Sequence, residues 1–218
     1  MKLDSFYQQI YVIHWKPLKE RKTYLEDIFE KHNLTKLVTW VDQYESKNDL
    51  KGVKNPFNLN KKLLMVNLSH LFCYNDQIKN KYKNILIFED DIDFEYLDII
   101  SYLNQAAKEF QELDGDIAFL SNCCGLEVKN AKPPKLLYYH PSYVTRCCAA
   151  YIVNEKCVEK LSNSVINCHA IDRVLNAMIP LLNLRCLWSG LAIKQGSETG
   201  KYTSALIDIR DKDGNYTL

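Results

Sequence analysis

The chain has 218 residues and a formal net charge of +1, and it is 47% hydrophobic and 25% charged, which is the balance of an ordinary globular domain. Because basic residues are not in surplus, the composition does not favour nucleic acid as a partner, and no block of like charge favours a membrane surface. With only 7 Gly and 6 Pro, the chain has little material for a disordered linker.

The pattern of apolar residues predicts strands and helices that alternate along most of the chain. In chain order we expect a strand at 10–15, a helix at 18–33, a strand at 36–41, a polar loop at 43–59, a helix at 60–81, a strand at 84–88, a helix at 95–113, strands at 116–120 and 147–153, helices at 154–163 and 170–179, and a strand at 184–188. Asn154 is a plausible cap for the helix that it precedes, and Pro180 is expected to end the last helix. This order is typical of an α/β layer fold with a largely parallel central sheet flanked by helices.

The N-terminal residues MKLDSFYQQIYVIHW do not have the pattern of a signal peptide. Their apolar run is short, it follows several polar residues, and it lacks a cleavage site of small residues. No stretch of the chain approaches the roughly 20 apolar residues that cross a bilayer. The sequence therefore predicts a cytoplasmic protein without a transmembrane segment.

Eight cysteines need an explanation, and without an export signal we expect them to be reduced thiols in the core. They are Cys73, Cys123, Cys124, Cys147, Cys148, Cys157, Cys168 and Cys186. A structural zinc site is the alternative, but the chain has no C-x-x-C pair. The spacing of His70 and Cys73 does not complete a four-ligand pattern.

The most informative stretch is ILIFEDDIDF, residues 85–94, in which a buried strand is expected to end in four acids. Glu89, Asp90, Asp91 and Asp93 would repel one another in a small volume unless a cation lies between them. In open α/β sheets, ligands bind beyond the carboxyl ends of the strands, which is where these acids fall. Carboxylates suit Mg²⁺ or Mn²⁺, although acids near a helix N-terminus can also simply favour the helix dipole.

No glycine-rich phosphate loop accompanies the acids, because neither GxxxxGK[ST] nor GxGxxG occurs in the chain. A bound diphosphate would therefore depend on the metal and on side chains. From the residues alone, the acids point to a metal or a sugar-nucleotide without separating the two.

The segment NLSHLFCYNDQIKNKYKNILIFEDDIDF, residues 67–94, resembles the core of glycosyltransferase family 25. The family pattern is a helix centred on Ser-His, here Ser69-His70, followed by an apolar strand that ends in Glu-Asp-Asp. The first strand and helix are also similar and include Arg21, but His14-Trp15 stands where the family usually has Asn-Leu.

Later parts of the chain follow the family order. CAAYIVNEKCVEKL is similar to its Ala-Tyr-Ile strand and the next helix, HAIDRVLNAMIP carries the Ile-Asp pair with Asp172, and LAIKQGSETGKYTSAL resembles the tail. The resemblance covers about residues 9–206.

The resemblance implies a GT-A-like single domain over residues 1–218, with a donor-binding half at about 1–120 and an acceptor half at about 121–218. It implies an inverting hexosyltransferase that uses UDP-galactose or UDP-glucose and Mn²⁺ or Mg²⁺. The acceptor would be a glycan, a lipid-linked saccharide or a protein hydroxyl. A lipid-linked acceptor would bring the enzyme into peripheral contact with a membrane.

Residue roles follow from the same resemblance. Asp91 is the expected metal ligand, and Asp93 would share the metal through the Asp-x-Asp spacing. Asp172 is the expected catalytic base, because an inverting transfer needs a carboxylate to take the proton of the acceptor hydroxyl. Solvated acids in the first turn of a helix are the plain alternative for Asp93 and Asp172.

The donor site is expected to draw on seven further side chains. They are Arg21, Ser69, His70, Glu89, Asp90, Gln195 and Ser204. A guanidinium suits phosphate oxygens, and Glu89 or Asp90 would hold the ribose or the sugar. A packed histidine at position 70 and a solvated polar tail around Gln195, Ser197 and Ser204 are the alternatives.

Two alternative functions are compatible with the same acidic residues. A metal-dependent nucleotidyl- or phosphoryl-transferring enzyme would use the acids with nucleoside triphosphates, and a degenerate glycosyltransferase domain would bind a glycan or a protein without turnover. The aromatic stretch LLYYHPSYV, residues 136–144, would line an acceptor groove or form an edge strand.

Overall fold

The structure is a computed structural model of the whole chain, and it describes residues 3–44, 49–56, 58–121, 128, 131–139, 148–162 and 169–202. The helices are α1 (Leu3–Phe6), α2 (Lys19–Lys31), the 3-10 helix η1 (Thr35–Leu37), α3 (Lys61–Asn80), α4 (Ile99–Glu112), α5 (Glu155–Ser162), α6 (Ile171–Leu181) and α7 (Gly196–Thr199). The strands are β1 (Gln9–Ile13), β2 (Val38–Val41), β3 (Asn84–Glu89), β4 (Ile92–Asp93), β5 (Ile117–Ser121), β6 (Leu137–Tyr139), β7 (Ala150–Asn154) and β8 (Cys186–Gln195).

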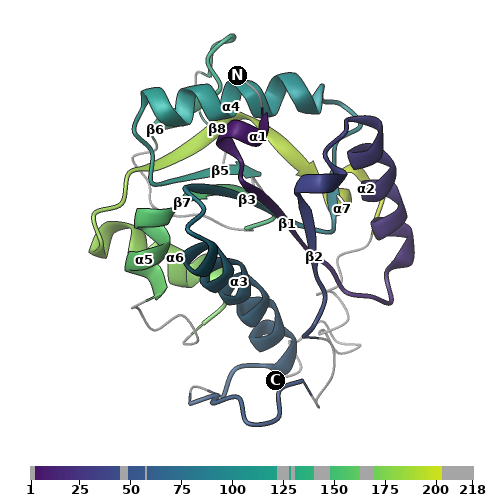
Figure 1. Cartoon of the computed structure of the whole chain (residues 1–218), viewed down its shortest axis with the longest axis vertical. Helices are drawn as coiled ribbons and strands as arrows, with labels where there is room; N and C mark the ends of the chain where they lie inside the picture. The colour runs from purple at the N-terminus through teal and green to yellow at the C-terminus, as the bar shows by residue number, and fades with distance from the viewer. Residues whose placement is uncertain are drawn as a thin grey trace.

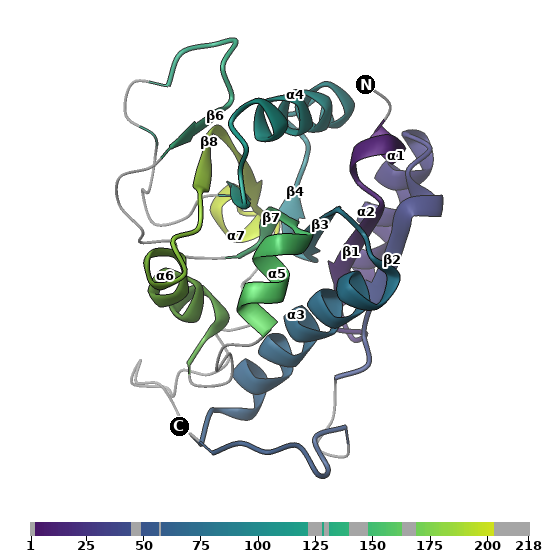
Figure 2. The same cartoon turned by 60° about the vertical axis from the view of Figure 1, so that its left-hand side comes forward.

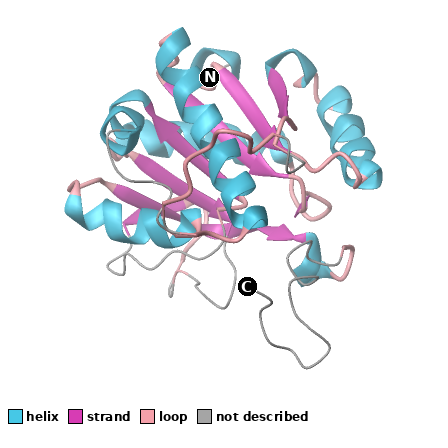
Figure 3. Cartoon of the chain, turned by 90° about the horizontal axis from the view of Figure 1, so that it is seen from below, coloured by secondary structure: helices cyan, strands magenta, loops and turns pink. Residues whose placement is uncertain are grey.

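One sheet joins all eight strands in the order β2-β1-β3-β7-β5-β8-β4, with β6 also paired to β8. The pairs β1–β2, β1–β3 and β5–β8 are parallel, whereas β7 is antiparallel to both of its neighbours, β3 and β5. It follows that β1, β2, β3, β5 and β8 run in one direction, and Figure 3 shows the strands as one twisted layer. The predicted α/β class, with a single domain and a sheet flanked by helices, is confirmed.

Helices cover both faces of the sheet because alternate residues of each buried strand point to opposite sides. In β3, Leu86 and Phe88 pack with α1, α2 and α4, whereas Ile85 and Ile87 pack with α3, α5 and α6. The two helical layers are visible on opposite sides of the sheet in Figure 1, and α3 and α5 come forward in Figure 2. The unbroken apolar run of β3 is thus explained by burial on both faces.

Most boundaries agree with the sequence-based expectation, and two capping side chains account for helix starts. The Asn154 Oδ1 accepts a hydrogen bond from Cys157 N at 2.7 Å, which confirms the predicted cap of α5. The α4 helix begins at Ile99 rather than at residue 95, because Asp98 accepts a hydrogen bond from Ser101 N at 3.2 Å. The α6 helix contains Pro180 and ends one residue later at Leu181.

The largest difference lies after Trp188, where the sequence pattern predicted a polar tail. The β8 strand instead continues to Gln195, pairing first with β5 and β6 and then with the two-residue strand β4. The β6 strand shows that residues 137–139 of the aromatic stretch belong to the edge of the sheet, and residues 140–144 lie outside the described ranges.

Four of the eight cysteines fall within the described residues, and all four are buried with free thiols. They are Cys73, Cys148, Cys157 and Cys186. Burial raises the pKa of each of these thiols, which suits small core residues rather than reactive groups. Cys123, Cys124, Cys147 and Cys168 lie outside the described ranges.

None of the helices within the described ranges is long and apolar enough to cross a membrane.

Candidate active site

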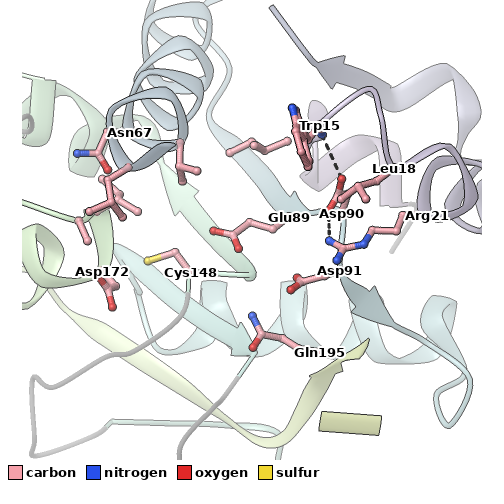
Figure 4. A pocket seen from close by; sticks show the side chains of 15 residues that line it. Trp15, Leu18, Arg21, Asn67, Glu89, Asp90, Asp91, Cys148, Asp172 and Gln195 are labelled. Carbon is pink, nitrogen blue, oxygen red and sulfur yellow. Dashed lines mark hydrogen bonds and ion pairs between the residues drawn. The ribbon is translucent and has the colours of Figure 1, made fainter. Parts of the chain in front are cut away.

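A pocket of about 300 Å³ opens at the carboxyl ends of β1 and β3 (Figure 4). It is lined by Ile13, Trp15, Leu18, Arg21, Leu63, Val66, Asn67, Glu89, Asp90, Asp91, Cys148, Ala170, Ile171, Asp172 and Gln195. Most of the lining surface is apolar, and the acids are among the few polar groups on it. Ligand sites commonly have this composition, in which a few polar groups orient the ligand.

The strand directions explain why residues so far apart in sequence meet here. The parallel strands β1 and β3 end at the same edge, so Ile13 and Glu89 are neighbours in register. The antiparallel strand β7 begins at that edge, which places Cys148 beside them. Gln195 arrives at the end of β8, and Asp172 comes from the first turn of α6.

Asp90 is held by three partners at the base of the pocket. Its Oδ1 accepts a hydrogen bond from Arg21 Nη1 at 2.7 Å, and its Oδ2 accepts from His14 Nδ1 at 2.7 Å and from Trp15 N at 3.2 Å. Asp90, Arg21 and His14 are all buried. Asp90 therefore fastens the end of β3 to the β1–α2 connection, and both of its oxygens are already occupied.

Asp91 has a different environment. Its Oδ1 is buried and has no hydrogen-bond partner among the described residues. Burial raises the pKa of Asp91 to about 7, and the negative charges of Glu89 and Asp90 add to the rise, while Arg21 opposes it. A buried carboxylate oxygen without a donor is costly unless a proton or a cation satisfies it.

The described residues contain no cluster of three or more His, Cys, Asp or Glu side chains that could hold a metal ion by themselves. The donor set nevertheless fits a hard cation such as Mg²⁺ or Mn²⁺, because such ions are often held by one or two carboxylates together with substrate phosphates and water. Asp91 has a buried oxygen available for that purpose.

Glu89 ends β3 and reaches into the pocket with a side chain that is 27% exposed. On its inner side, Glu89 Oε1 lies 3.4 Å from Nε2 of His70, which is completely buried. His70 does not line the pocket itself, and it is linked to the pocket through its contact with Glu89.

Asp172 occupies the opposite wall. It lies in the first turn of α6 and is partly exposed, and Figure 4 shows it across the open space from Asp91. On the same side of the pocket in Figure 4, Asn67 of α3 donates a hydrogen bond from Nδ2 to the carbonyl oxygen of His169 at 2.6 Å. That bond ties the start of α6 to α3 and so fixes the wall that carries Asp172.

Residues 7–175 match the family model described as glycosyltransferase family 25 (LPS biosynthesis protein). The chain belongs to glycosyltransferase family 25. The match includes the whole acid cluster, the Ser69-His70 pair and Asp172. No significant match was found among curated proteins. Family 25 membership supports a glycosyltransferase of the lipopolysaccharide-biosynthesis type, with a sugar donor and a glycan acceptor.

The structure does not bring Asp93 into this pocket. Its Oδ1 accepts hydrogen bonds from Tyr24 Oη at 2.9 Å and Glu95 N at 3.1 Å, and lies 3.3 Å from Lys201 Nζ. Its Oδ2 accepts from Thr199 Oγ1 at 2.9 Å. Asp93 therefore joins α2 to the segment after β8. Both of its oxygens are occupied by these contacts, which does not favour a metal shared with Asp91.

Ser69, Gln195 and Ser204, all expected in the donor site, differ in where they lie. Ser69 faces into the protein, where its Oγ donates to the Met65 carbonyl within α3 at 3.0 Å, and it does not line the pocket. Gln195 does line it, although the family 25 match ends before this residue. Ser204 lies outside the described residues, and Ser197 is exposed on α7.

Sequence reasoning did not anticipate the apolar wall of the pocket, nor Trp15, Asn67 and Cys148 within it. Trp15 is 40% exposed at the end of β1, Cys148 precedes β7, and Asn67 stands two residues before Ser69. The departure from the family pattern at His14-Trp15 was a signal that this corner is unusual. Nothing in the sequence pointed to Cys148 or Asn67.

Proposed function

We propose that this family 25 protein transfers a hexose, galactose or glucose, from a UDP-sugar to a hydroxyl group of a glycan, a lipooligosaccharide or a protein, with inversion and with the help of Mn²⁺ or Mg²⁺. The observation that carries the proposal is the placement of two acids in one pocket: Asp91, with an unsatisfied buried oxygen, and Asp172 on the opposite wall. A GT-A-like arrangement of donor and acceptor sites belongs to the same proposal.

The acid end of the pocket suits the leaving group. Asp91 would hold the divalent ion, which supplies positive charge that stabilises the diphosphate as it departs. Arg21 adds a fixed positive charge at this end, held in place by Asp90. The chain lacks a glycine-rich phosphate loop, so these side chains take over that task.

The transfer itself is a single displacement. The acceptor oxygen forms a bond to C1 of the hexose as the bond from C1 to the diphosphate oxygen breaks, and that oxygen keeps the electron pair. Asp172 takes the proton of the acceptor hydroxyl from the face opposite the diphosphate. Its place across the pocket from Asp91 supports this division of roles.

The test is UDP release from a panel of UDP-sugars with Mn²⁺, with Mg²⁺ and with EDTA, without an added acceptor. Slow transfer to water makes knowledge of the acceptor unnecessary. We expect metal-dependent release from one or two UDP-hexoses. The same panel includes nucleoside triphosphates, and turnover of these instead would assign the pocket to nucleotidyl or phosphoryl transfer. Silence on every compound, with no UDP binding in calorimetry, would favour a non-catalytic binding domain.

A further inference from the structure

A chain of buried polar side chains leads from Glu89 into the core between α3 and β7. His70 Nε2 lies 3.4 Å from Glu89 Oε1, His70 Nδ1 lies 2.8 Å from Tyr151 Oη, and Tyr151 Oη lies 2.9 Å from Tyr74 Oη. His70, Tyr151 and Tyr74 have no exposed surface. The His70 and Tyr151 rings are stacked, with centroids 5.7 Å apart and an interplanar angle of 27°.

Packing alone does not account for these residue types. Phenylalanine would fill the space of either tyrosine, and a buried hydroxyl or imidazole is costly unless each polar atom is paired. Here the two hydroxyls and Nδ1 satisfy one another. The remaining atom, Nε2, is buried without a hydrogen-bond partner among the described residues, and the carboxylate of Glu89 lies 3.4 Å from it. The chain thus ends on a side chain of the pocket.

One arrangement of protons suits every member. Burial raises the pKa of both Tyr74 and Tyr151, so both keep their hydroxyl protons. Tyr74 then donates to Tyr151, Tyr151 donates to His70 Nδ1, and the imidazole proton is left on Nε2, 3.4 Å from Glu89 Oε1. The reverse direction would turn the lone pair of Nε2 toward a carboxylate, which is repulsive.

We infer that His70, Tyr151 and Tyr74 are positioning residues that fix the carboxylate of Glu89 as the acceptor for hydroxyl groups of the donor's hexose. This inference rests on the proposed function. Glu89 suits the task because it reaches the pocket while Asp90 is saturated by Arg21, His14 and Trp15. The buried Nε2 of His70 has no other partner among the described residues and lies 3.4 Å from Oε1, so it favours a carboxylate orientation in which Oε1 stays on the side of His70. Oε2 is then left to accept hydrogen bonds from neighbouring hydroxyls of a sugar ring.

The proton arrangement is tested by the imidazole nitrogen resonances of the ¹⁵N-labelled protein, with the His70 signals assigned by their loss in His70→Gln. We expect a neutral imidazole with its proton on Nε2, and Tyr151→Phe should shift the Nδ1 resonance by removing its donor. Tyr102→Phe is the matched control, because Tyr102 is a buried tyrosine whose hydroxyl bonds Ser189 Oγ on the other side of the sheet. A proton on Nδ1 in the wild type would overturn the inference.

The sugar contact is tested by calorimetry with UDP and with the UDP-hexose that the panel selects, both with Mn²⁺. Glu89→Gln should lower the affinity for the UDP-hexose by about 10-fold or more, and Tyr151→Phe by about 2–10-fold. The affinity for UDP should stay the same in both variants, and Tyr102→Phe should change neither. Equal losses for UDP and the UDP-hexose, or no loss in Tyr151→Phe, would overturn the inference.

These outcomes separate the inference from the proposed function. A wild-type protein that binds neither UDP nor any UDP-hexose refutes the proposed function and the sugar contact together, whereas the imidazole resonances still decide the positioning chain. A wild-type protein that releases UDP normally, with Tyr151→Phe indistinguishable from it, refutes the positioning chain and leaves the proposed function intact.

Discussion

Arg21 and Asp90 form a buried ion pair, with Arg21 Nη1 2.7 Å from Asp90 Oδ1 and the two side chains 4% and 9% exposed. They are 69 residues apart in the chain. This pairing separates the roles of two neighbouring acids. Asp90 fastens the end of β3 to the β1–α2 connection, whereas Asp91 keeps a buried oxygen without a hydrogen-bond partner among the described residues. Arg21 also lies 5.2 Å from the ring centroid of Tyr202, so the pair is covered by the segment that follows β8.

The first prediction concerns this pair. Asp90→Ala removes the partner of a buried guanidinium and of His14, and we expect the free energy of unfolding to fall by about 3–5 kcal/mol. Urea denaturation measures this. The control is Asp42→Ala, which removes the surface partner of Lys16, 3.6 Å away, and should cost less than about 1 kcal/mol. Equal effects of the two substitutions would mean that the buried pair does not hold the pocket together.

The second prediction concerns the pH dependence of the metal-free protein. The pKa of Asp91 is raised in the folded state, so its contribution to stability is fully present below the unfolded pKa and is lost as pH rises toward about 7. Asp91→Asn removes this loss. We expect the variant to be more stable than wild type at pH 8 by about 1–3 kcal/mol and to lose that advantage near pH 4.

Thermal unfolding at several pH values, in EDTA, measures the effect of Asp91→Asn. With Mn²⁺ and UDP at pH 8 the order should reverse, because the wild-type carboxylate gains a cation and the variant does not. A variant that is no more stable than wild type at pH 8 would show that Asp91 carries no unfavourable charge in the folded protein.

The acid cluster illustrates what the sequence could predict. An apolar run that ends in acids places the acids at the carboxyl edge of a sheet, and the structure puts Glu89, Asp90 and Asp91 there. Their separate roles depend on partners such as His14, Arg21 and His70, which meet them through the strand order. No local pattern encodes that order, so the assignment of Asp90 to the donor and of Arg21 to the diphosphate did not anticipate their mutual pairing.

The contacts of Asp93 also depend on strand pairing that the sequence does not reveal. Its Asp-x-Asp spacing with Asp91 indicated a shared metal, but the two-residue strand β4 pairs with β8 and aligns Asp93 with Lys194. A strand this short leaves no periodic signal, and β8 itself continued through residues that read as a polar tail. The side chain is consequently drawn into contacts with α2 and with Thr199 and Lys201.

The third prediction follows from this placement. Burial alone would raise the pKa of Asp93, but hydrogen bonds from Glu95 N, Tyr24, Thr199 and Lys201 outweigh it, and the pKa is lowered. Asp93 therefore adds stability above its unfolded pKa, and this is lost as pH falls through the lower folded value. We expect Asp93→Asn to cost about 1–3 kcal/mol at pH 7 and progressively less below pH 4.

Calorimetry distinguishes this role from a metal ligand. Asp93→Asn should bind UDP with Mn²⁺ as the wild type does, at a temperature where both are folded, whereas Asp91→Asn should lose metal-dependent binding. If Asp93→Asn also abolished that binding, the Asp-x-Asp interpretation would be restored.

The last prediction concerns the catalytic base. Asp172→Asn keeps the shape of the side chain but cannot take a proton, so UDP release should fall by about 10²–10⁴-fold while the affinity for UDP with Mn²⁺ stays unchanged. Asp4→Asn is the control, because Asp4 is also an acid in the first turn of a helix but lies outside the pocket. A release rate near wild type in Asp172→Asn would assign the base to another acid of the pocket, and Glu89 would be the next to substitute. Loss of UDP affinity in this variant would instead place Asp172 on the donor side of the pocket.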